Sequence, residues 1–385
     1  MDYIPDDSLA LVLSIVSWAD RASVRATSKR FVEVVASEIF AGLRRGVDET
    51  AIVVVQREVG GPTWILVGDR LLKGPPLPVT ATICGSHCAL VGAEVFVVVS
   101  SDVREDRSHL FALDVARGAW RELAAPPGPI SGPSLEAVNG RLILAGGELL
   151  PPDHQSDEHM ESIHLGSRDL VAAGVHEYDF QANEWRPLSQ MSMPVRDAAS
   201  AVLGNQMVII GGVDFSHEGY ARRGLQCHEL QFYDTDTNRW SEPVIMHCDH
   251  PPAPTCANAI ALNGNGYIEY TGGILNGQVQ DRVEIITPEH NCIIMPEDEI
   301  LEKFEYHPPS FFQCPVGCVK HTNAKGTRER LVVLDRKNTF QKFTCDHTCD
   351  PPAWWTPIRQ IPRTTPSRDE YDFDFPSMCS RVPLV

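Results

Sequence analysis

The chain has 385 residues, which predicts two domains or one large all-β domain with an appendage. Its net charge of −18 argues against a nucleic-acid or acidic-membrane surface, because no dense block of Lys and Arg offsets it. Eleven cysteines, an odd number, favour reduced thiols over a disulfide framework and a cytoplasmic or nuclear protein.

The first residues and the longest apolar run predict neither secretion nor membrane insertion. Asp2, Asp6 and Asp7 stand where a secretory signal needs a basic start. The run from Ala89 to Val99 is interrupted by Glu94, so we expect no transmembrane helix.

Residues 1–48 have the pattern of short helices. Pro5 is suited to the first turn of a helix, and Asp6 and Asp7 favour the same turn through the helix dipole. Apolar positions then recur at three-to-four spacing at Leu9, Val12, Leu13 and Val16, and again at Val24, Thr27, Phe31, Val34 and Val35. So small a unit cannot bury a core alone, so it is expected to lean on a partner or to cap the next domain.

This N-terminal segment resembles an F-box, a family that begins with Leu-Pro and ends in Val-Cys-Lys-Arg-Trp. Ile4-Pro5 matches the beginning and Thr27-Ser28-Lys29-Arg30-Phe31 the end, with Ile4, Thr27-Ser28 and Phe31 as departures. The resemblance implies binding to a Skp-type adaptor and through it to a cullin. It assigns that contact to the apolar residues Ile4, Pro5, Leu9, Val12, Leu13, Val24 and Phe31.

Residues 49–366 repeat a phrase made of an apolar strand, a double glycine and a later aromatic pair. The clearest copy has Met207 to Ile210, Gly211-Gly212, Tyr233-Asp234 and Trp240. The double glycines Gly146-Gly147, Gly211-Gly212 and Gly272-Gly273 recur after 65 and 61 residues, and Trp120, Trp185 and Trp240 recur after 65 and 55. Glycines suit the crowded strand ends, and each tryptophan suits the wedge between neighbouring units.

The repeat resembles the kelch repeat, whose unit is one blade of a β-propeller. The resemblance predicts an all-β propeller, with blades at about 51–77, 82–122, 134–189, 197–245, 255–296 and 310–359. Six blades are expected, with seven as the alternative. Ring closure usually mixes strands from both chain ends, so Tyr371 to Phe375, in the tail of residues 367–385, is the expected closing strand.

Loops on one face of the propeller are the candidate recognition site. The longest insertion is 148–174, for which recognition and disorder both fit, and 214–224 and 247–254 are expected beside it. The resemblance implies that Arg196 contacts a ligand, and a surface ion pair is the alternative. Arg222 and Arg223 are further substrate-binding candidates.

Two groups of Cys and His were weighed as metal sites. One contains Cys314, Cys318, His321, Cys345, His347 and Cys349, and the other His247, Cys248, His250 and Cys256. Their irregular spacing favours buried thiols over zinc, so neither a metal nor a cofactor is expected. No Ser-His-Asp set, phosphate-binding glycine loop or HExxH segment indicates catalysis.

An F-box followed by kelch repeats is typical of substrate receptors. The resemblance therefore implies a non-catalytic substrate-recognition subunit of a Skp–cullin–F-box ubiquitin ligase, whose target protein is unknown. A kelch scaffold with a helical cap and no ligase role is the alternative, and a metal-dependent propeller enzyme is a third possibility.

Overall fold

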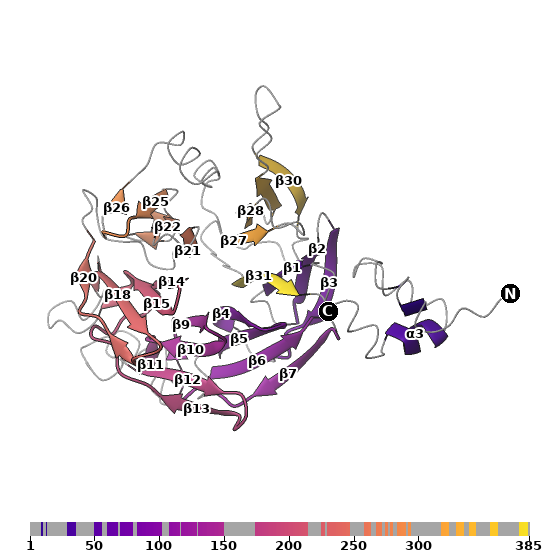
Figure 1. Cartoon of the computed structure of the whole chain (residues 1–385), viewed down its shortest axis with the longest axis horizontal. Coiled ribbons are helices and arrows are strands. Elements are labelled where there is room, and N and C mark those ends of the chain that lie inside the picture. Colours follow the sequence, from indigo (N-terminus) through magenta and orange to yellow (C-terminus); the bar gives the residue numbers. More distant parts are fainter. Residues whose placement is uncertain are drawn as a thin grey trace, which may run out of the picture.

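The computed structural model describes residues 9–10, 13, 29–35, 50–55, 60–67, 70–79, 83–101, 108–115, 117–128, 130–149, 174–214, 225–227, 229–246, 258–262, 267–271, 274–275, 278–279, 283–289, 292–293, 317–322, 329–334, 339–343, 355–360 and 377–383. Antiparallel sheets in these residues are arranged around a central axis (Figure 1). The helix α3 (Lys29–Val35) lies outside the ring, beside the first sheet (Figure 1). In the described part of the chain, no helix is long and apolar enough to span a bilayer.

Six sheets of the described residues form the blades of the ring. From the innermost strand outwards, blade 1 holds β31 (Ser377–Pro383), β1 (Thr50–Val55), β2 (Pro62–Val67) and β3 (Arg70–Pro76). Blade 2 holds β4 (Ile83–Val91), β5 (Glu94–Ser101), β6 (Ser108–Asp114) and β7 (Ala119–Leu123). Blade 3 holds β9 (Ser134–Val138), β10 (Arg141–Ala145), β12 (Val175–Asp179) and β13 (Glu184–Pro187).

The second half of the ring follows the same strand order. Blade 4 holds β14 (Ala199–Leu203), β15 (Gln206–Ile210), β18 (Glu229–Asp234) and β19 (Arg239–Trp240), and β20 (Val244–Ile245) also pairs with β18. Blade 5 holds β21 (Asn258–Leu262), β22 (Tyr267–Thr271), β25 (Val283–Ile286) and β26 (Cys292–Ile293). Blade 6 holds β27 (Gly317–Thr322), β28 (Glu329–Leu334), β29 (Thr339–Phe343) and β30 (Trp355–Gln360).

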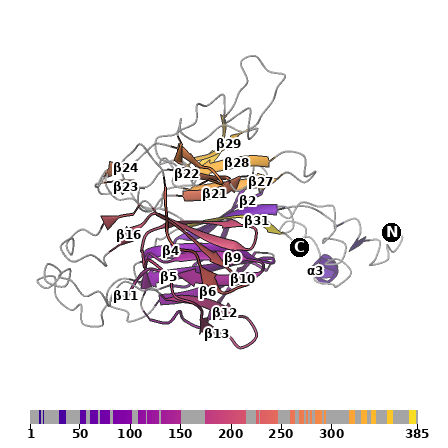
Figure 2. The ribbon, with the colours of Figure 1, turned by 60° about the vertical axis from the view of Figure 1, so that its left-hand side comes forward.

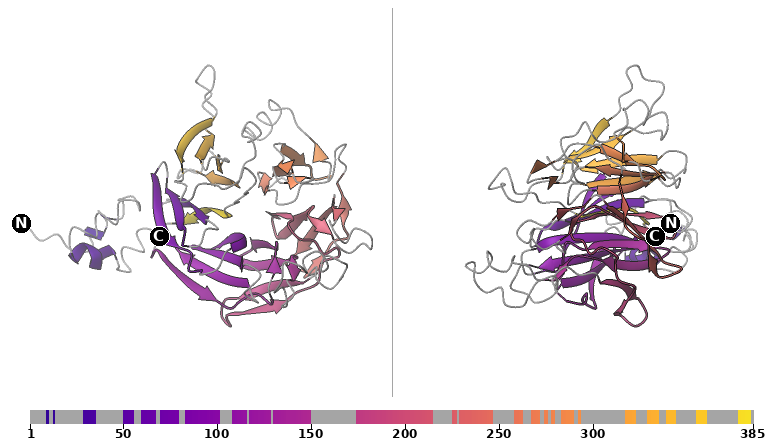
Figure 3. Two further views of the ribbon diagram at one scale, coloured as in Figure 1. Left: turned by 180° about the vertical axis from the view of Figure 1, so that it is seen from behind. Right: turned by 90° about the vertical axis from the view of Figure 1, so that its left-hand side faces the viewer.

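The innermost strands of the blades close a circle. They contact one another in the order β31, β4, β9, β14, β21 and β27, and β27 contacts β31 again. Figures 2 and 3 show this ring obliquely, from behind and from the side. The expected all-β propeller is therefore confirmed, and the described strands make six blades.

The strand that completes blade 1 comes from the tail but not from the expected segment. Tyr371 to Phe375 lies outside the described residues, and the strand paired with β1 is β31, which begins at Ser377. A physical reason is charge density: Tyr371 to Phe375 carries two carboxylates in five residues, Asp372 and Asp374, whereas the seven residues of β31 carry one charge, at Arg381. β31 instead offers an uncharged stretch around Met378 and Cys379 to β1.

The core consists of apolar layers between neighbouring blades. Along β5, Val95, Val97 and Val99 join a cluster shared with blade 1, whereas Phe96 and Val98 join a cluster shared with blade 3. Successive side chains point to opposite faces of a strand. A strand whose two faces pack against the two neighbouring blades must therefore be apolar at every position. This explains why the repeat reads as unbroken apolar runs.

The three repeated tryptophans occupy equivalent places on the outermost strands of blades 2, 3 and 4. Each indole N–H donates to a backbone carbonyl at the end of the preceding blade: Trp120 to Pro75 (3.2 Å), Trp185 to Ala124 (3.0 Å) and Trp240 to Ser189 (3.0 Å). Each ring also packs against the apolar cluster between the two blades. The tryptophans therefore join the blades both by packing and by hydrogen bonding.

An asparagine completes this contact in blades 3 and 4. Asn183 and Asn238 adopt positive φ angles of 55° and 52° in the preceding turns. Their side-chain oxygens accept the backbone N–H of Ala124 and Ser189, each at 3.0 Å, and also the hydroxyl of a tyrosine in their own blade. Ala124 and Ser189 are thus each held through both the backbone N–H, by the asparagine, and the backbone C=O, by the tryptophan. Blade 2 has Gly118 in this turn, so only the indole bond is formed there.

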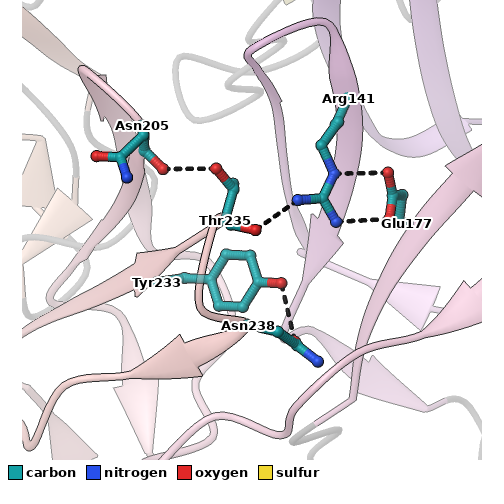
Figure 4. A network of polar contacts seen from close by, with 6 residues as sticks. All are labelled: Arg141, Glu177, Asn205, Tyr233, Thr235 and Asn238. Atoms are coloured by element: carbon teal, nitrogen blue, oxygen red, sulfur yellow. Dashed lines mark hydrogen bonds and ion pairs between the residues drawn. The ribbon is translucent and has the colours of Figure 1, made fainter.

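Arg141 forms a second link between blades 3 and 4, shown in Figure 4. Its guanidinium makes two 2.7 Å bonds to Glu177 and donates to the Thr235 carbonyl oxygen of blade 4 at 2.6 Å. The Thr235 hydroxyl in turn donates to the Asn205 carbonyl oxygen at 2.9 Å. A bidentate ion pair holds the guanidinium in a fixed plane, so its remaining N–H can act as a directed donor.

Candidate functional site

The two rims of the propeller differ in how the chain turns. Hairpin turns between the first and second and between the third and fourth strands, such as Asn139-Gly140 and Gln181 to Asn183, form what we call the hairpin face. The opposite rim carries the connections between second and third strands, and we call it the insertion face. Its described parts in blades 3, 4 and 5 are Glu148–Leu149, Val213–Asp214 and Ile274–Leu275.

Each insertion begins with a short two-stranded sheet. In blade 3, β11 (Glu148–Leu149) pairs with β8 (Ile130–Ser131). In blade 4, β16 (Val213–Asp214) pairs with β17 (Leu225–Gln226), and in blade 5, β23 (Ile274–Leu275) pairs with β24 (Gln278–Val279). These pairs fix where the long loops leave the ring.

The double glycines make this arrangement possible. Gly147 and Gly212 have φ angles of 96° and 94°, a region that side chains disfavour. A Cβ atom on Gly147 would collide with Ile130, and one on Gly212 would lie 2.8 Å from the Arg196 carbonyl oxygen. Glycine is therefore required where the second strand of a blade ends against the linker that leads into that blade. Gly272 and Gly273 lie outside the described residues.

Arg196 is placed at the junction of blades 3 and 4 on the insertion face. Its backbone N–H donates to the Val213 carbonyl oxygen at 3.2 Å and its own carbonyl accepts from Val213 at 2.9 Å. Its Nε lies 3.2 Å from a Glu148 carboxylate oxygen and its Nη1 lies 3.0 Å from an Asp197 oxygen. The guanidinium therefore forms the ion pairs that were the alternative to ligand binding, while 27% of the side chain remains exposed.

Asp197 ties this junction to the linker before blade 3. Its φ angle is 53°, and its backbone N–H donates to the Gly132 carbonyl oxygen at 2.8 Å. Gly132 must be a glycine, because a Cβ atom there would overlap the Asp197 carboxylate. We call Gly132, Glu148, Arg196 and Asp197 the mouth cluster.

Carboxylates outnumber cations around the mouth cluster. Glu148 and Asp197 share the single guanidinium of Arg196, and Asp214 is buried directly after Val213. Nearby, burial raises the pKa of Cys227 to about 12, and the charges of Glu229 and Asp214 add to the rise. This thiol is therefore protonated at neutral pH. The described part of the face is therefore charged, and a partner of complementary charge would be favoured there.

Several expected site residues fall outside the described part of the chain. These are Arg222, Arg223, most of the loops 148–174, 214–224 and 247–254, and the adaptor residues Ile4, Pro5, Val12 and Val24. The described residues hold no group of three or more His, Cys, Asp or Glu able to bind a metal ion. Of the candidate metal ligands, Cys318 and His321 lie on β27, and the others fall outside.

The described helical residues pack against one another. Leu9, Ala10, Leu13 and Val34 are buried together, with Phe31 packed against them. Val32, on the other side of α3, keeps 42% of its surface exposed. Leu9 and Leu13 thus stabilise the helical segment itself, and their role in adaptor binding stays a prediction.

The sequence did not indicate Glu148 and Asp197 as partners of Arg196. Glu148 follows the double glycine directly, and Asp197 follows Arg196, so both positions were visible in the repeat. What was missing is the contact across the blade junction, such as that of Ser200 on β14 with Glu136 on β9, 64 residues apart. Such contacts depend on how two blades dock and not on spacing within either.

Comparison with known proteins agrees with the propeller. No family model matches the chain. The chain is similar to Kelch-like protein 15 of Danio rerio, at 27% identity over 171 residues, 44% of this chain and 24% of that protein. It is also similar to Kelch repeat and BTB domain-containing protein 12 of Danio rerio, at 24% identity over 39% of the chain and 23% of that protein.

A longer match extends the similarity over more of the ring. Kelch-like protein 34 of Homo sapiens is 22% identical over 255 residues, which is 66% of this chain and 35% of that protein. The aligned part of this chain thus spans about a quarter to a third of these relatives. Together with the closed ring of antiparallel blades, these similarities define the fold as a kelch β-propeller.

Proposed function

We propose that this protein is the substrate-recognition subunit of a Skp–cullin–F-box ubiquitin ligase, a non-catalytic component acting in the cytoplasm, the nucleus or both. The observation that carries the proposal is the combination of a kelch propeller with a preceding helical segment that resembles an F-box. The similarity to Kelch-like proteins supports the propeller as the recognition module.

The direction of the strands supports two separate binding regions. β1 begins at Thr50 opposite Pro383, and strands in this position run from the hairpin face to the insertion face. Residues 1–48 therefore join the propeller from the hairpin face, and the mouth cluster lies on the opposite rim. An adaptor and a substrate could then bind at the same time.

The adaptor contact is tested by the double variant Pro5→Ala and Leu9→Ala in the full-length chain. We expect it to abolish co-purification with a Skp-type adaptor, because Pro5 sets the start of the first helix and Leu9 stabilises the helical cluster. Burial of each such apolar side chain contributes about 1.5–3 kcal/mol. Binding is measured with purified adaptor, and propeller integrity by the thermal unfolding of the same variant.

The alternative of a helical cap predicts the reverse outcome. In that case the wild-type chain would show no adaptor binding, and the double variant would lower the melting temperature of the propeller. Charge reversal at Arg239, far from the helical segment on β19, is the control for non-specific effects.

Substrate recognition is tested at Arg196. Arg196→Glu would place a third carboxylate beside Glu148 and Asp197, which lie 3.2 and 3.0 Å from the present guanidinium. Like charges so close cost several kcal/mol, so we expect the linker to shift and substrate affinity to fall at least about tenfold. Affinity is measured by calorimetry with a substrate identified by proximity labelling in cells.

One matched control separates the effect at Arg196 from a general effect of charge. Arg239→Glu makes the same charge change on an exposed position of the hairpin side and should leave affinity unchanged. Because the chain carries a net charge of −18, a basic substrate segment is favoured, and its association rate should fall with added salt. A substrate that binds both variants equally would refute the insertion face as the recognition site.

A further inference from the structure

A half-buried carboxyl group bridges the innermost strands of blades 3 and 4. On β9, Leu135 and Ala137 pack towards blade 2, whereas Val138 belongs to the cluster shared with blade 4. Side chains alternate along a strand, so Glu136 turns towards blade 4. There the Ser200 hydroxyl of β14 donates to a Glu136 carboxyl oxygen at 2.7 Å.

The surroundings of Glu136 are largely apolar. The other residues of β14 are Ala199, Ala201, Val202 and Leu203, and β15 carries no titratable group. On β10, Arg141 is engaged by Glu177. On β4, at the blade 2 side of β9, the titratable residues are Cys84, His87 and Cys88. Burial raises the pKa of Glu136 to about 7, and the Ser200 hydrogen bond lowers it in part. Some of the side chain still meets solvent, so the folded ring can hold either form.

This pair is connected to the mouth cluster by short segments of chain. β9 starts at Ser134, just after Gly132, and β14 starts at Ala199, just after Asp197. Gly132 and Asp197 are themselves joined by a 2.8 Å backbone hydrogen bond across the two blades. A change in the spacing of β9 and β14 would therefore be transmitted to this bond.

We propose that Glu136 and Ser200 form a pH-responsive latch between blades 3 and 4. In the closed ring the apolar surroundings of β9 and β14 disfavour the carboxylate more than the Ser200 hydrogen bond favours it. Ionisation of Glu136 therefore loosens the two innermost strands and, through them, the mouth cluster. This latch is independent of the ligase role, because it is a property of the propeller alone.

The sign of the effect follows from proton linkage. Closed blades hold the proton more tightly than open ones, where the carboxyl would return to its ordinary pKa of 4.5. Opening therefore releases a proton and becomes more favourable as the pH rises from about 4.5 to about 7, and it levels off above that. Within this window the opening constant can rise up to roughly tenfold per pH unit.

Amide hydrogen exchange of the full-length chain between pH 5 and 8 tests the latch. After correction for intrinsic exchange rates, the amides of β9, β14 and Asp197 should lose protection as the pH rises to about 7 and change little above it. Glu136→Gln should remove this dependence. Ser200→Ala should move the level-off point to higher pH, because the hydroxyl lowers the pKa of Glu136. Glu242→Gln, on an exposed residue after β19, should keep the wild-type profile.

Two results would overturn the latch. The first is a pH dependence that is the same in Glu136→Gln and in the wild type. The second, which applies even if Glu136→Gln does not fold, is a carboxyl resonance of wild-type Glu136 that titrates near its ordinary value and is unmoved by Ser200→Ala. Neither measurement requires a substrate or an adaptor, so failure of the proposed ligase role would be recognised separately.

Discussion

Replacing Trp185 by alanine is expected to lower the free energy of unfolding by about 3–5 kcal/mol, as for other truncations of packed aromatic side chains. The ring packs against the cluster between blades 2 and 3, and its centroid lies 5.3 Å from that of Tyr178. Its N–H also holds the Ala124 carbonyl oxygen at 3.0 Å. Denaturant unfolding followed by circular dichroism measures the loss.

Trp185→Phe is the matched control for this effect. It keeps an aromatic ring in the wedge and removes only the N–H donor, so we expect a loss of about 1 kcal/mol from the hydrogen bond. A cost below 1 kcal/mol for Trp185→Ala would show that the tryptophan does not join the blades. Equal costs for the two variants would place the whole effect in the hydrogen bond.

Deleting residues 377–385 is expected to open the ring. β31 pairs with β1 from Thr50↔Pro383 to Val55↔Ser377, and it is the strand of blade 1 in contact with both β27 and β4. Its loss would expose backbone groups of β1 and the fully buried residues Ala51, Val53 and Val54. We expect a loss comparable to the whole stability of a small domain, about 5 kcal/mol or more, and a melting temperature lower by roughly 10 °C or more.

Two further samples identify the cause of that loss. Removal of Leu384 and Val385 alone, which follow β31, should leave the melting temperature unchanged. A synthetic peptide of residues 377–385 added to the shortened chain should restore stability in proportion to its concentration, because it binds only the folded state. Unchanged melting after the full deletion would mean that β31 does not close the ring.

The sequence alone determined that the chain is a propeller. Apolar strands, double glycines and tryptophans recur in phase, and each is needed for one blade to bury its surface against the next. Trp120, Trp185 and Trp240 therefore predicted equivalent outer strands, and the structure places them there. The repeat length favoured six blades and left seven open, and the described strands make six.

The tertiary structure alone decided how the ends and linkers meet. Closure by Ser377–Pro383 depends on which tail segment fits between β27 and β4, and no local pattern encodes that fit. The same holds for the pairing of Arg196 with Glu148 and of Ser200 with Glu136. The apolar pattern within one blade follows from the strands of that blade, so it can be seen in the sequence. Polar contacts across a blade junction depend on how two complete sheets pack against each other, so they cannot.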